Sequence, residues 1–132
     1  MNISTNKKIL LLRILSFFVI VFGVMTIYSG GFALFGGVSG KEFAGKYVPF
    51  VLWFNFIAGF FYVICGVGVF FDKEWTLKLA KLILGSTGIV FILFGDFVIS
   101  GGEYEIRTIE AMTFRSIFWI VVVKALRKLT LK

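Results

Sequence analysis

Four long apolar segments separated by short polar stretches dominate the pattern of the chain. They cover residues 9–35, 48–71, 77–99 and 106–126, approximately. A helix needs roughly 20 apolar residues to cross the hydrocarbon core of a bilayer. The pattern therefore predicts an all-α integral membrane protein, with residues 1–132 forming a single four-helix bundle that spans the membrane four times.

The fourth segment is the least apolar of the four. Its uninterrupted apolar stretch, Ser116 to Val123, is too short to span a bilayer alone. The preceding turns, which carry Arg107, Glu110 and Arg115, must then enter the membrane with it, or the bilayer must thin locally. The first segment is expected to be a retained anchor helix, because no convincing small-residue cleavage site follows it.

The segments between the apolar stretches contain residues that interrupt helices. Residues 36–47 are rich in Gly and Ser and are predicted to be a loop. They lead to Pro49, and Pro is well tolerated in the first turn of a helix. Residues 72–76 predict a tight connection, and Gly101-Gly102 is a natural stop for the third helix.

Lys and Arg residues are distributed unequally between the two predicted sides of the membrane. Short cytoplasmic connections carry an excess of Lys and Arg, so the richer side predicts that both termini are cytoplasmic. The richer side holds Lys7, Lys8, Arg13, Lys73, Lys78, Lys81, Lys124, Arg127, Lys128 and Lys132, and the poorer side holds Lys41, Lys46, Arg107 and Arg115.

The composition supports a membrane protein and excludes several other classes. Hydrophobic residues make up 59% of the chain and charged residues only 16%, against about half and a quarter in a soluble domain. The net charge of +7 comes from residues that flank apolar segments, so no nucleic-acid partner is expected. A lone Cys65 and the absence of His exclude an internal disulfide, a CxxC pair and a His-ligated haem or metal. No cofactor is expected, and Cys65 is expected to be an inert buried thiol.

Glycines recur at helical spacing in the second and third segments. Gly59 and Gly66 are seven residues apart, and Gly85, Gly88 and Gly95 lie near one face of a helix. Small residues let helix backbones approach closely in lipid. Packing within the chain is the favoured interpretation, and a face for a partner helix is the alternative.

Asp96 is the most informative residue of the sequence. It lies between two apolar runs, residues 91–94 and 97–99, and should therefore lie below the outer surface of the membrane. A carboxylate there is costly unless it is paired, protonated or hydrated. Arg115 of the next helix lies at a similar depth and is the predicted partner.

Further polar residues are expected at the same depth. Asn55 lies one to two turns into the second helix, and Tyr28 lies toward the outer end of the first, near Thr26. Glu110 and Arg107 are three residues apart, a spacing that permits an ion pair. Three interpretations stay open: a structural ion-pair network, an outward-facing pocket for a small polar ligand or a quinone head group, and a conduction path. The nearly apolar inner half argues against a channel.

Two features of the first two thirds of the chain resemble the DoxX-like family of bacterial four-helix membrane proteins. One is an Arg early in the first helix with a Gly ten residues later, Arg13 and Gly23. The other is a Pro-led second helix with spaced glycines, in the runs 55–59 and 65–68, followed by a short charged turn. The resemblance implies a multi-pass protein of the bacterial inner membrane with redox or quinone-linked partners, and it transfers no catalytic residue.

The sequence thus favours an accessory or interaction subunit of a membrane complex, in contact with the lipid bilayer and with a partner protein or further copies of itself. The alternative is a small-solute transporter or binding protein with an outward-facing polar pocket. An enzyme using Asp96 or Glu110 as a general base is a third possibility. It is less favoured, because no nucleophile with an adjacent base is visible.

Overall fold

The structure is a computed structural model that describes residues 5–45 and 48–130. Within these residues the chain forms five helices and no strand. Four of the helices are long and one is short. They are α1 (Thr5–Phe35), α2 (Gly37–Ala44), α3 (Pro49–Phe70), α4 (Thr76–Ile99) and α5 (Ile106–Thr130).

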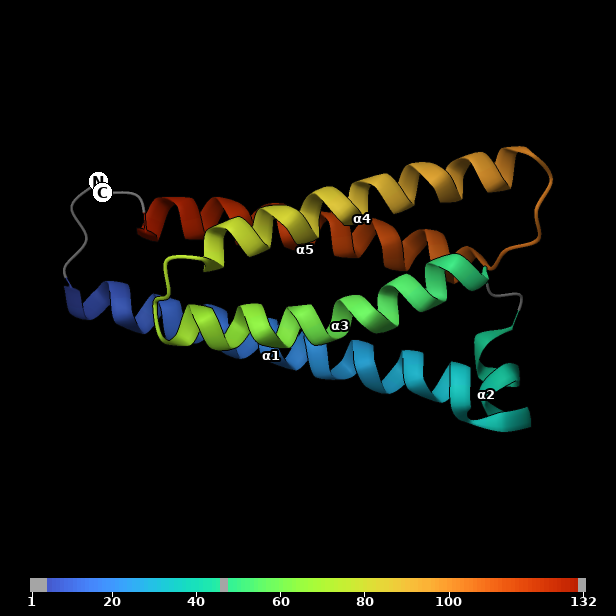
Figure 1. Cartoon of the computed structure of the whole chain (residues 1–132), viewed down its shortest axis with the longest axis horizontal. Helices are drawn as coiled ribbons and strands as arrows, with labels where there is room; N and C mark the ends of the chain where they lie inside the picture. The colour runs from blue at the N-terminus through green and yellow to red at the C-terminus, as the bar shows by residue number, and fades with distance from the viewer. Residues whose placement is uncertain (1–4, 46–47, 131–132) are drawn as a thin grey trace.

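The long helices run side by side, and the molecule has two distinct ends (Figure 1). The start of α1, the α3–α4 turn and the end of α5 lie together at one end, here called the terminal end. The opposite end, called the α2 end, holds α2 and the α4–α5 connection. At the terminal end, Lys8 of α1 forms an ion pair of 3.4 Å with Asp72 in the turn.

Three helices are long and apolar enough to cross a membrane, which indicates a membrane protein. They are α1 from Asn6, α3 and α4. The fourth predicted span, residues 106–126, corresponds to α5, which does not meet this standard in the described part of the chain. The physical reason is its charge, because Arg107, Glu110 and Arg115 interrupt the half of α5 that precedes its apolar stretch.

The connections agree with the sequence in two places and differ in one. Gly101 has φ +92° and follows the end of α4, and Asp72 has φ +53° in the tight turn before it. Residues 36–47 were predicted to be a loop, and this is wrong, because most of them form α2. The Gly and Ser content that disfavours an isolated helix here allows a close contact, since Gly40 packs against the carbonyl oxygen of Phe32.

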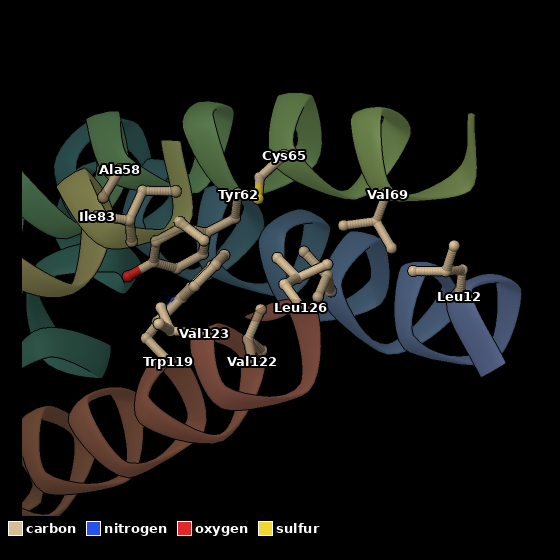
Figure 2. Packing of buried hydrophobic residues seen from close by; sticks show 12 residues of the cluster. Leu12, Ala58, Tyr62, Cys65, Val69, Ile83, Trp119, Val122, Val123 and Leu126 are labelled. Atoms are coloured by element: carbon tan, nitrogen blue, oxygen red, sulfur yellow. The ribbon is translucent and has the colours of Figure 1, made fainter. Parts of the chain in front are cut away.

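The main core lies toward the terminal end and draws side chains from all four long helices (Figure 2). Its centre is Trp119 of α5 against Tyr62 of α3, both fully buried, with ring centroids 4.9 Å apart. Leu12 of α1 and Leu126 of α5 belong to the same cluster. The members of this cluster are apolar or aromatic, so packing of their side chains is the main contact among them.

Glycines bring α1 and α3 into close contact. A Cβ placed on Gly59 would lie 2.8 Å from Ile27 Cγ1 and 3.1 Å from the Ile27 amide nitrogen. Gly23 of α1 is equally confined, with the side chain of Val63 2.9 Å from its notional Cβ. The Ser16 hydroxyl donates a hydrogen bond of 2.7 Å to the carbonyl of Gly66. For α3, packing within the chain is therefore the correct interpretation of the glycine spacing.

Candidate functional site

A cavity of about 180 Å³, with several polar side chains in a mostly apolar lining, lies at the α2 end, between α1, α3 and α5. The second apolar cluster of the molecule, around Phe94 and Met112, lies at this end and is built without residues of α1. The polar side chains of the cavity lie beyond the part of α1 that belongs to the main core. They are Thr26 and Ser29 of α1, Asn55 of α3, Glu105 just before α5, and Arg107, Thr108 and Arg115 of α5.

Arg115 is the less exposed of the two arginines of α5 that line this cavity. Its Nη1 donates a hydrogen bond of 3.0 Å to Thr26 Oγ1, and its guanidinium carbon lies 5.4 Å from the centre of the Phe22 ring. Its Nε is buried and makes no hydrogen bond with the described residues. None of the carboxylates in the described part of the chain lies within 4.0 Å of Arg115.

The other polar side chains of the cavity enter it from different heights along their helices. Asn55 is six residues into α3, and its buried Oδ1 has no hydrogen-bond partner among the described residues. Arg107 lies two turns before Arg115 on α5. Glu105 precedes α5 and contacts Gly45 after α2, where a Cβ would collide with the carboxylate. Among the described residues, the charged groups that line the cavity are two guanidinium groups and one carboxylate.

The structure separates the six predicted site residues into two groups. Arg115, Arg107 and Asn55 line the cavity, whereas Asp96, Glu110 and Tyr28 do not. Tyr28 is 76% exposed and lies two residues after Thr26, which turns it about 200° away from the cavity. Glu110 is exposed on α5, and the ion pair that its spacing from Arg107 permits is not found among the described residues.

The predicted ion pair between Asp96 and Arg115 is also absent. Asp96 follows the fully buried Phe94 by two residues, so its side chain points about 200° away from the core. The depths of Asp96 and Arg115 along their helices permit an ion pair, but the side of α4 that carries Asp96 faces away from Arg115. Asp96 is exposed and has no ion-pair partner among the described residues.

Asp96 instead belongs to an outward face of α4, which we call the α4 face. It consists of Gly85, Ile89, Ile92 and Asp96, all exposed and all spaced at three or four residues. A Cβ placed on Gly85, Gly88 or Gly95 would find no atom within 4 Å. Packing within the chain therefore does not explain the glycines of α4, in contrast to those of α3.

Three polar residues of the cavity, Ser29, Glu105 and Thr108, were not predicted from the sequence. Ser29 follows Thr26 by three residues, so helical spacing from Thr26 was a usable signal. Glu105 lies outside the helix, and its approach to Gly45 depends on α2, which the sequence did not reveal. No group of three or more His, Cys, Asp or Glu residues in the described ranges could hold a metal ion.

Comparisons with protein-family models, curated proteins and solved structures found no match for this chain. The resemblance to the DoxX-like family therefore stays a prediction.

Proposed function

We propose that this chain is a small interaction subunit of a bacterial inner-membrane complex, which binds a partner membrane helix on the α4 face. In this proposal four helices cross the bilayer and both termini are cytoplasmic. The observation that carries the proposal is Asp96, an exposed carboxylate on an apolar helix surface. The DoxX-like resemblance adds the expectation that the partner belongs to a redox or quinone-linked complex.

The surroundings of Asp96 make lipid an unfavourable neighbour for it. Ile92, one turn before, is 74% exposed, and Ile99, one turn after, is 88% exposed. An ionised Asp on a lipid-facing helix costs about 2.5–3.5 kcal/mol near the bilayer centre, and less at the depth of Asp96, which lies three residues before the end of α4. The Asp96 side chain is too short to move its carboxylate far along the helix. A partner group at the same depth would bind the carboxylate and reduce the cost of burying it in lipid.

Charge complementarity defines the partner. A symmetric pair of α4 helices from two copies would bring one Asp96 against another, and like charges repel. A partner helix with Lys or Arg at the same depth would form a charge-assisted hydrogen bond instead. The open backbone at Gly85 and Gly88 favours close approach of such a helix, because small residues reduce the distance between helix axes in lipid.

The test is photo-crosslinking from the α4 face in membranes of the native host. A photoreactive residue replaces Ile92, and a second variant carries it at Ile117, which is exposed on α5. We expect an adduct with a different membrane protein from position 92 and not from position 117. Mass spectrometry should map the adduct to a membrane helix that contains Lys or Arg.

Substitution of Asp96 supplies the matched control. Asp96→Asn should reduce the adduct about tenfold, since a polar contact between membrane helices contributes about 1–2 kcal/mol. Asp96→Glu should retain most of it. An adduct with lipid alone, an adduct with a second copy, or equal yields from the Asn and wild-type forms would each contradict the proposal.

A further inference from the structure

Arg115 is a half-buried cation with a buried Nε, and no carboxylate of the described part of the chain lies within 4.0 Å of it. A guanidinium has five N–H donors, and Arg115 donates one hydrogen bond, to Thr26, within the described residues. The Phe22 ring beneath it supplies a weaker attraction for the cation. An unpaired charge in low-dielectric surroundings is costly, and a counter-ion that accepts the remaining hydrogen bonds lowers that cost.

The cavity beside Arg115 has the charge and size for such a counter-ion. Arg107 lines it as well, and Glu105 is its only carboxylate among the described lining residues, so the balance of formal charge is positive. Its volume of about 180 Å³ is below the range of roughly 300–1,000 Å³ found for drug-sized ligands. A small oxyanion fits this combination.

Asn55 and the hydroxyl groups of Thr26 and Ser29 offer hydrogen bonds to a ligand in the cavity. Asn55 Oδ1 is buried without a hydrogen-bond partner, and the two ends of an amide can exchange places to donate or to accept. Thr26 and Ser29 line the α1 side of the same cavity. A ligand that carries a hydroxyl group next to its anionic group would therefore satisfy both Arg115 and Asn55.

We infer that this cavity is a binding site for a small oxyanion, a carboxylate or phosphate group that forms charge-assisted hydrogen bonds with Arg115. The anion is either a free solute or the head group of a lipid, because both present the same oxygen atoms. The site is independent of the α4 face, since the two are lined by different residues. Either proposal can fail while the other stands.

The experiment uses the full chain, purified in a phosphate-free, lipid-free detergent buffer. Thermal unfolding is followed during titration with sodium phosphate and, separately, sodium lactate, against sodium chloride at equal ionic strength. In a parallel arm, native mass spectrometry compares retention of phosphatidylglycerol with that of phosphatidylcholine. Stabilisation by phosphate or lactate identifies a free solute, and selective retention of phosphatidylglycerol identifies a lipid head group.

Variants of two arginines on α5 connect either result to the cavity. Arg115→Gln should weaken binding roughly tenfold to hundredfold, the loss expected for hydrogen bonds to a charged group. Arg127→Gln removes an exposed charge at the other end of α5 and should leave binding unchanged. Thr26→Ala removes the hydroxyl that positions the guanidinium, and should weaken binding even if Arg115→Gln fails to fold.

The inference is wrong if neither arm detects a preference over chloride or over phosphatidylcholine. It is equally wrong if a folded Arg115→Gln or Thr26→Ala variant binds as well as the wild type. A loss that is identical in Arg127→Gln would show attraction by net charge alone, and would also overturn the site.

Discussion

At the scale of single residues, Ser16 illustrates how one hydroxyl links two apolar helices. It is buried and donates to the carbonyl of Gly66, 50 positions away in the sequence. Ser86 has the same side chain but donates to Leu82, one turn back in its own helix. The first bond exists only when α1 and α3 are packed together, whereas the second forms within α4 alone.

We therefore expect Ser16→Ala and Ser86→Ala to differ in stability. Ser16→Ala should lower the free energy of unfolding by about 1 kcal/mol, within the range measured for hydrogen bonds between membrane helices. Ser86→Ala should change it by less than about 0.5 kcal/mol. Reversible unfolding in mixed detergent micelles measures both values, and equal losses would show that the link between α1 and α3 contributes nothing.

The part of the site that could be predicted is the part that depends on depth along a helix. The sequence places Arg115, Arg107 and Asn55 in the same half of the membrane, and all three line the cavity. The predicted ion pair of Asp96 with Arg115 is wrong because it depends on which face of α4 carries Asp96. The burial of Phe94, which reveals that face, is known only from the structure. An almost uniformly apolar helix carries little information about which face is inside.

At the scale of elements, α3 and α4 use their glycines differently. Gly59 is enclosed by the backbone and side chain of Ile27, whereas Gly85 faces open space. The sequence shows helical spacing of glycines in both elements, so spacing alone could not distinguish an internal contact from an exposed face. The helices themselves were predictable from their length and hydropathy. The helix α2 was not, because its short Gly-rich sequence is stabilised by contact with Phe32.

Alanine at these two positions provides a matched comparison. Gly59→Ala should destabilise the protein by about 1–3 kcal/mol, because Ile27 and the Gly23 carbonyl leave no room for a methyl group. Gly85→Ala should be neutral or slightly stabilising, since Ala is the better helix former and nothing lies within 4 Å. Thermal unfolding of the purified chain distinguishes them. Similar losses at both positions would contradict the close packing of α1 on α3.

At the scale of the whole molecule, the packing of α5 bears on the number of membrane crossings. The helix has 25 residues, or about 37 Å, against about 30 Å of hydrocarbon. Its Leu126 shares a cluster with Leu12 near the start of α1, and its Met112 shares a cluster with Phe94 near the end of α4. A helix that packs at both ends against apolar spans lies at the same depth as those spans, even though its own hydropathy is low.

If α5 crosses the membrane beside the other three long helices, single cysteines should differ in their accessibility from outside. In a Cys65→Ala background, Ser100→Cys tests the α4–α5 connection, Lys73→Cys the α3–α4 turn, and Lys128→Cys the end of α5. A membrane-impermeant maleimide applied to spheroplasts should label position 100 and leave 73 and 128 unlabelled until lysis, because the proposed orientation places the Lys-rich end in the cytoplasm. Labelling of both 100 and 128 in spheroplasts would show that α5 does not cross. Labelling of 73 and 128 without 100 would show the opposite orientation, and the carboxylate of Asp96 would then lie toward the cytoplasm.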